Sequence, residues 1–89
     1  MYLAKVIGVV VATHKVESLK GEKILLVQPI DTNEHPTGNS QVVIDAVGAG
    51  AGEVVLIATG SSARKVFGNN DTPIDASIVG IVEHVEVTG

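Results

Sequence analysis

Cysteine is absent from this 89-residue chain, and Tyr2 and Phe67 are its only aromatic residues. Without cysteine the chain can form neither a disulfide nor a zinc–thiolate site, which is compatible with a reducing compartment. Without stacking aromatics it lacks the usual platform for single-stranded nucleic acid. Basic residues are also few, six against ten acidic ones, for a formal net charge of −4. This balance argues against a polyanionic partner, so no nucleic acid is expected.

Long hydrophobic runs are missing as well. The apolar run over residues 6–12 is far shorter than a membrane span, and no targeting segment is recognisable, so no membrane association is expected. The composition is nevertheless 45% hydrophobic, and almost all of that is aliphatic. The length predicts one domain over residues 1–89, which is too small to bury so much apolar surface alone. The excess favours an oligomer, in which a neighbouring copy covers apolar surface.

The order of the residues predicts a β-rich domain. Five segments rich in β-branched residues, separated by turns, are expected to form strands: 2–13, 23–30, 41–47, 53–59 and 74–87, the last as one strand or a strand pair. One short helix is expected over residues 61–67, with a serine N-cap and Gly68 as its stop. This pattern predicts a mainly β fold, a five-stranded and partly closed antiparallel barrel of the oligonucleotide/oligosaccharide-binding type. The first strand is apolar on both faces, which places the core on one face and a neighbouring subunit on the other.

Two glycine-rich loops, at residues 48–52 and 60–62, flank the fourth predicted strand. The first is similar to a dinucleotide fingerprint, but Glu53 replaces the last glycine and a strand follows in place of a helix. No pyrophosphate site is therefore expected. Ser62 and Lys65 match the spacing of a serine–lysine nucleophile motif without its companion elements, so a capped short helix is the better interpretation.

Other candidate chemistry is equally sparse. The three histidines, His14, His35 and His84, do not have metal-ligand spacing. We therefore predict no catalytic, cofactor-binding or metal-binding residues. The backbone N–H groups of the first glycine loop leave open the binding of a small anion. Arg64 could pair with Asp45 or Asp75 across subunits, because apolar residues flank all three.

Four blocks of the sequence together resemble a known family. They are YLAKVIGVVVATHK, LKGEKILLVQPID, VVIDAVGAGAGEVVLIATGSSAR and PIDASIVGIVEHV, and they span nearly the whole chain. In this order and at these separations they resemble the pentameric vertex proteins of bacterial microcompartment shells, the ethanolamine-utilisation and carboxysome type. The loops VGAGAGE and GSSAR are the most specific parts of the resemblance.

The resemblance implies a structural protein without catalysis or a cofactor. It implies a homopentamer that caps the vertices of a polyhedral shell otherwise tiled by hexameric shell proteins, in the bacterial cytoplasm. Residues expected to line a narrow pore at the five-fold axis are Gly48, Ala49, Gly50, Ala51, Gly52 and Glu53. Residues expected at the subunit interface are Gly60, Ser61, Ser62, Arg64, Asp45 and Asp75. The alternative is a small barrel that binds a small anion or an oligosaccharide.

Overall fold

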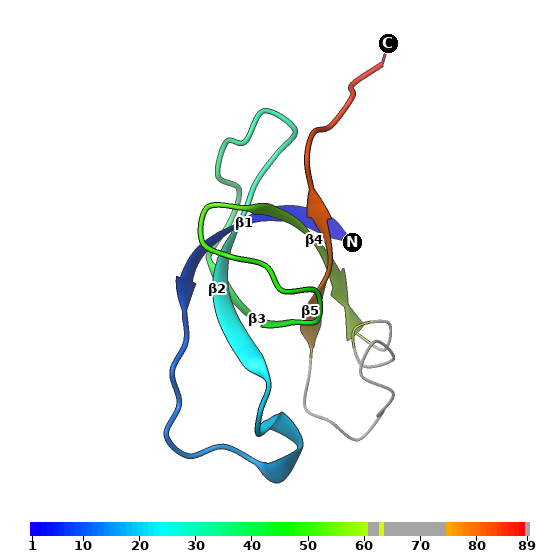
Figure 1. Ribbon diagram of the computed structural model, residues 1–89. Coiled ribbons are helices and arrows are strands. Elements are labelled where there is room, and N and C mark those ends of the chain that lie inside the picture. The colour runs from blue at the N-terminus through cyan, green and yellow to red at the C-terminus, as the bar shows by residue number, and fades with distance from the viewer. Residues whose placement is uncertain (61–62, 64–74, 89) are drawn as a thin grey trace.

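The computed structural model describes residues 1–60, 63 and 75–88, and within them the chain forms a five-stranded barrel (Figure 1). The strands are β1 (Tyr2–Val9), β2 (Lys23–Pro29), β3 (Gln41–Asp45), β4 (Val54–Thr59) and β5 (Ala76–Val82). They neighbour one another in the order β1-β2-β3-β5-β4, and β4 returns to β1. The predicted mainly β, five-stranded barrel is confirmed. The helix expected over residues 61–67 lies, except for Ala63, outside the described residues.

The barrel differs from the expected one in two details. It is fully closed, where a partly closed one was predicted, because β5 pairs with both β4 and β3. It also contains one parallel pair, because β3 and β5 run in the same direction where Ile44 lies opposite Ser77 and Asp45 lies opposite Ile78. The other four strand pairs are antiparallel. A last strand that fits between two earlier ones is difficult to foresee from local sequence patterns.

Side chains that alternate along each strand build the core inside this barrel. In β2, for example, Leu25 and Val27 are almost completely buried, whereas Leu26 between them faces outward and is half-buried. The main core contains aliphatic residues from all five strands and one alanine from a loop: Ala4, Val6, Leu25, Val27, Val43, Ala49, Val55, Ile57, Ala76 and Ile78. The outer faces of several strands stay apolar as well, as the two apolar faces of the first predicted strand suggested.

The segment after β1 is not a strand, although the sequence predicted one as far as residue 13. β1 has a register shift between Val6 and Gly8, and it ends at Val9. Val11, beyond that end, is 85% exposed. A short 3-10 turn over Glu17–Leu19 follows, which the sequence did not predict, and Leu19 packs with Ile44 and Ala63 in a second small cluster. This cluster covers Ile44 on the outward side of β3.

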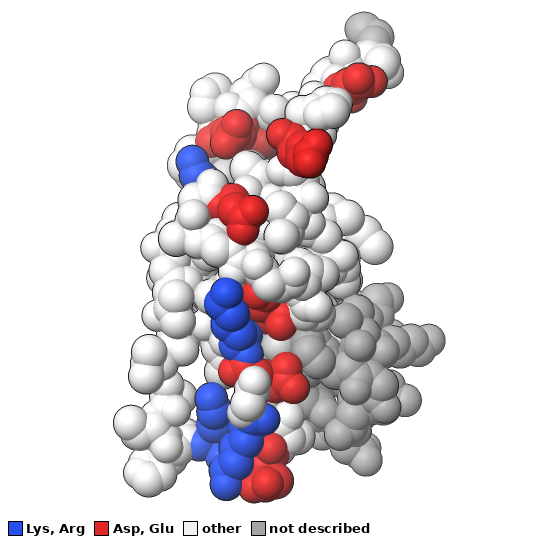
Figure 2. All heavy atoms as spheres, in the orientation of Figure 1, with Lys and Arg blue, Asp and Glu red and all other residues white. Residues whose placement is uncertain are grey.

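Charged side chains are unevenly spread over the surface. Figure 2 shows them as a band along the long axis of the molecule, with a broad uncharged area to the left of the band. Of the helices in the described parts of the chain, none is long and apolar enough to cross a membrane.

Candidate functional site

The segment between β3 and β4, residues 46–53, forms a loop that crosses one end of the barrel (Figure 1). We call this segment the glycine loop. Gly48 and Gly52 have φ angles of 84° and 85°, in the left-handed region that glycine adopts without strain. Between them, Ala49 is fully buried and belongs to the main core. The loop therefore closes the end of the barrel and inserts one methyl group into it.

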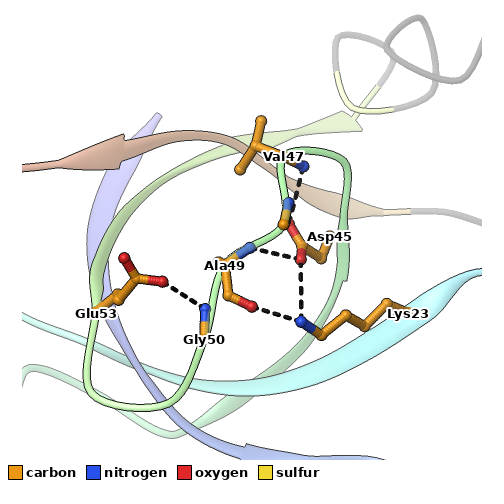
Figure 3. Close-up of polar contacts among 7 residues, drawn as sticks. Lys23, Asp45, Val47, Ala49, Gly50 and Glu53 are labelled. Carbon is orange, nitrogen blue, oxygen red and sulfur yellow. Dashed lines mark hydrogen bonds and ion pairs between the residues drawn. The ribbon is translucent and has the colours of Figure 1, made fainter.

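Asp45, the last residue of β3, holds the first half of the glycine loop (Figure 3). Its Oδ1 accepts hydrogen bonds from the backbone N–H groups of Val47 at 2.9 Å and Gly48 at 3.1 Å. Its Oδ2 accepts a third, from the N–H of Ala49 at 2.7 Å. The Asp45 side chain is only 1% exposed. One buried carboxylate thus satisfies three consecutive backbone donors.

Lys23 completes the contacts of this carboxylate from the first residue of β2. It lies directly opposite Asp45 in the register of β2 and β3. Its Nζ is 3.7 Å from Asp45 Oδ2 and donates a hydrogen bond of 2.6 Å to the carbonyl oxygen of Ala49. The Lys23 side chain is 49% exposed, so its stem reaches inward from the surface.

Glu53 holds the second half of the loop. Its Oε1 accepts a hydrogen bond of 2.6 Å from the backbone N–H of Gly50, and its own N–H donates to the Gly50 carbonyl at 3.2 Å. The loop end is joined to β1 by two more backbone bonds, from Gly52 N–H to the Val6 carbonyl at 2.9 Å and from Val6 N–H to the Glu53 carbonyl at 3.0 Å. The tip of the loop is therefore a closed turn attached to the barrel wall.

These contacts bear on the binding of a small anion, which the sequence left open. Exposed N–H groups in a glycine loop can form an anion-binding concavity. Here the N–H groups of Val47, Gly48 and Ala49 already donate to Asp45, and that of Gly50 donates to Glu53. The chain supplies its own two carboxylates to the donors that an external anion would need. The arrangement favours a rigid structural loop over an anion site.

The residues expected to line a pore occupy three different environments. Gly48, Ala51 and Gly52 are exposed, Gly50 and Glu53 are half-buried, and Ala49 is buried. Because the Ala49 methyl group points into its own barrel, only its backbone is left to face an opening. The exposed members of the glycine loop are thus the ones free to meet neighbouring copies.

The residues expected at the subunit interface are only partly described. Asp45 is bound within its own chain and has almost no exposed surface to offer a neighbour. Asp75 is exposed, and its carbonyl accepts a hydrogen bond of 2.9 Å from the N–H of Gly60. Ser61, Ser62 and Arg64 lie outside the described residues. The pairing of Arg64 with either aspartate stays a prediction.

Sequence reasoning missed Lys23, although a signal for it exists. A basic residue begins one predicted strand and an acidic residue lies near the end of the next, directly before a glycine loop. In an antiparallel pair these two ends lie side by side, so an ion pair beside the loop is the expected outcome. In the parts of the chain that the structure describes, no group of three histidine, aspartate or glutamate side chains is placed to hold a metal ion.

Comparison with known proteins relates this geometry to a family. The model of the family described as ethanolamine utilisation protein EutN/carboxysome matches residues 1–83. The microcompartment shell vertex protein GrpN of Rhodospirillum rubrum is 54% identical over 86 residues, which are 97% of each chain. The carboxysome shell vertex protein CcmL of Synechocystis sp. is 53% identical over 87 residues, or 98% of this chain and 87% of that relative. The solved structure of the pentameric shell protein GrpN superposes with a TM-score of 0.90 at 51% identity, covering 99% of this chain and 100% of the other.

Proposed function

This chain belongs to the ethanolamine utilisation protein EutN/carboxysome family, and we propose that five copies of it form a ring that caps a vertex of a bacterial microcompartment shell. In a closed ring every contact is heterologous, because one surface of a subunit meets a different surface of the next. A subunit of such a ring needs two unlike apolar surfaces on opposite sides. The observation that carries the proposal is that the outside of this barrel has both.

The first surface lies on the outer faces of β1, β2 and β3. Gly8, Leu26 and Val42 are consecutive cross-strand partners there. Val42 is 59% exposed and Leu26 is half-buried. Gly8 leaves the flank of Leu26 uncovered, since a Cβ added at Gly8 would lie 3.8 Å from the Leu26 Cβ. We call these three residues the β2 patch.

The second surface lies on the outer faces of β1, β4 and β5. Leu3, Leu56 and Gly80 are consecutive cross-strand partners in the same way. Here too a glycine uncovers a leucine, since a Cβ added at Gly80 would lie 3.9 Å from the Leu56 Cβ. We call these three residues the β4 patch. β2 and β4 flank β1 on opposite sides, so the two patches face in different directions, as a heterologous ring requires.

In this ring the glycine loops of the five copies surround the axis. Gly48, Ala51 and Gly52 then border a narrow opening, while Glu53 and Ala49 hold each loop in shape from within its own barrel. Small residues at the exposed positions allow five backbones to approach closely. Ser61, Ser62 and Arg64 lie at the boundary with the next subunit in this proposal.

The role is structural and calls for no catalysis or cofactor. The two carboxylates and the ammonium group of the site are bound to backbone groups of the loop, and the relatives named above are shell proteins. The partners are four further copies of the chain and the hexameric shell proteins around the vertex. Neither nucleic acid nor a membrane takes part, and the assembly lies in the shell of a microcompartment in the bacterial cytoplasm.

Native mass spectrometry tests the proposal directly. We expect a pentamer at micromolar protein concentration, and electron microscopy of shells made together with hexameric shell proteins should place it at the vertices. A protein that stays monomeric, or shells that close with this chain excluded from the vertices, would overturn the proposal.

A further inference from the structure

Ala49 is the anchor through which the barrel holds the glycine loop. Its methyl group is buried in the core, its N–H donates to Asp45 Oδ2 at 2.7 Å, and its carbonyl accepts from Lys23 Nζ at 2.6 Å. All three groups of the residue are therefore fixed. Gly48, just before it, and Ala51, two residues after it, are exposed. Their positions follow from the position of Ala49.

Lys23 supplies the positive charge of this anchor. A carboxylate buried as deeply as that of Asp45 is costly unless it is hydrogen-bonded and paired. The three backbone N–H groups supply the hydrogen bonds, and Lys23 is the only cation paired with Asp45 among the described residues. The same ammonium group binds the Ala49 carbonyl. A charge-assisted bond of this kind is stronger than a bond between neutral groups.

From these contacts we propose that Lys23 is a positioning residue that, through Asp45 and Ala49, sets the conformation of the glycine loop and so the width of the axial opening. The part about the opening rests on the proposed ring. The part about the loop concerns a single barrel and can be tested without the ring. Loss of the Lys23 charge loosens the first half of the loop, residues 47–49, and leaves the tip at Gly50 and Glu53 closed by its own hydrogen bonds.

Hydrogen exchange of the loop amides tests the first part. Lys23→Met keeps the aliphatic stem and removes the charge. In this variant the amides of Val47, Gly48 and Ala49 should exchange roughly tenfold faster or more, because a hydrogen bond to a charged group usually stabilises a structure by about that factor. Lys20→Met is the matched control, because Lys20 is 62% exposed and pairs only with the exposed Glu17 among the described residues. Lys23→Arg keeps the charge and should restore most of the protection. Equal exchange rates in Lys23→Met and Lys20→Met would overturn the proposal.

A second measurement needs no variant. In nuclear magnetic resonance spectra of the unmodified protein, the Lys23 ammonium protons should exchange slowly enough to be observed, and those of Lys20 should not. Rapid exchange at both lysines would contradict the proposed contact even if Lys23→Met failed to fold.

The opening itself is measured in the assembled ring. If the unmodified chain and Lys23→Met both form pentamers, electron microscopy should show weaker density for the glycine loops and a less defined opening in the variant. Unchanged loops in that ring would overturn the role in the opening. If the unmodified chain forms no pentamer, the proposed function is wrong. The hydrogen-exchange comparison of Lys23→Met with Lys20→Met still decides whether Lys23 sets the loop conformation.

Discussion

The Glu53 carboxylate folds back onto Gly50, three residues before it, and accepts a hydrogen bond of 2.6 Å from its backbone N–H. The backbone of the same glutamate donates to the Gly50 carbonyl at 3.2 Å. The carboxylate is thus turned toward its own loop. A glutamate beside a glycine-rich loop suggests a charged pore lining, but here it acts first as a cap on a turn.

Removing this cap should weaken the loop tip. Glu53→Ala leaves the Gly50 N–H without its acceptor, and we expect a loss of about 1 kcal/mol in the free energy of unfolding. Glu53→Gln keeps an oxygen acceptor and should lose less. Urea denaturation at one fixed protein concentration measures both, since assembly makes stability depend on concentration. Equal losses in the two variants would contradict the capping role.

Alanine substitutions within the glycine loop should differ in cost according to backbone conformation. Gly48 has a φ of 84° and no atom within 4 Å of an added Cβ, so Gly48→Ala costs about 1–2 kcal/mol through strain alone. Gly50 lies outside the left-handed region, and its added Cβ would meet only the movable Glu53 Oε1, at 3.4 Å. Gly50→Ala should therefore cost less. Denaturation midpoints rank the two variants, and the reverse order would contradict this account.

A bulky side chain at Gly50 tests the crowding of the axis more directly. It has to displace the Glu53 carboxylate, and in the proposed ring the disturbed loop then shifts the exposed residues Gly48, Ala51 and Gly52 that face the other copies. We expect Gly50→Leu to disturb ring assembly more than Gly50→Ala does, as measured by native mass spectrometry. Unchanged assembly in both variants would show that the loop does not lie at the axis.

A charge on the β2 patch should separate the subunits without unfolding them. Val42 is 59% exposed on the outside of the barrel, so Val42→Asp places no charge in the core. In a ring the same charge would be buried against a neighbour and left unpaired, at a cost of several kcal/mol. We expect monomers by native mass spectrometry with an unchanged circular dichroism spectrum. Val42→Thr is the control of similar shape and should stay assembled.

Alkaline pH should destabilise the fold through Tyr2. Burial, and then the negative charge of Asp75, raise the pKa of Tyr2 above its ordinary value of 10.0. A group whose pKa is raised by folding adds stability that is complete below its unfolded pKa and is lost as the pH rises through its folded pKa. Stability should therefore fall above pH 10 in the unmodified protein, and less so in Tyr2→Phe. Asp75→Asn should lower the pKa of Tyr2.

The sequence makes this last measurement simple. Tyr2 is the only tyrosine and tryptophan is absent, so ultraviolet absorbance follows the ionisation of this one side chain. The Tyr2 hydroxyl donates a hydrogen bond of 2.9 Å to Gln41 Oε1, which Tyr2→Phe also removes. The pH dependence, and not the stability at neutral pH, is therefore the informative quantity. A normal pKa for Tyr2 would contradict the prediction.

Local sequence patterns were sufficient to predict five strands and the kind of fold, but the first and last predicted strands, 2–13 and 74–87, ran past the observed ends at Val9 and Val82. Alternation along β2, with Leu25 and Val27 inside and Leu26 outside, follows from the period of two residues in any strand. The excess of aliphatic residues also predicted outer apolar surfaces, of which Val42 is an example. These features depend on near neighbours in the chain, which a sequence displays directly.

Features that depend on distant residues were less predictable. The parallel pairing of β3 with β5 joins Asp45 to Ile78, and no local pattern distinguishes it from an open edge. Ser77 is completely buried, and its hydroxyl lies 3.4 Å from the Ala63 carbonyl, although serine usually suggests a surface. The ion pair of Asp45 was not predicted because its partner Lys23 lies 22 residues earlier. Only the folded barrel brings the two together.

The position of β5 between β3 and β4 has a consequence for how the protein is made. β5 is the last of the five described strands in chain order, and until residues 76–82 have been synthesised the other four can form only an open sheet with unpaired edges at β3 and β4. Such edges readily pair with other chains. Barrel closure therefore has to wait until β5 has left the ribosome. Before β5 pairs with β3 and β4, the growing chain thus exposes two strand edges of the kind that favours aggregation.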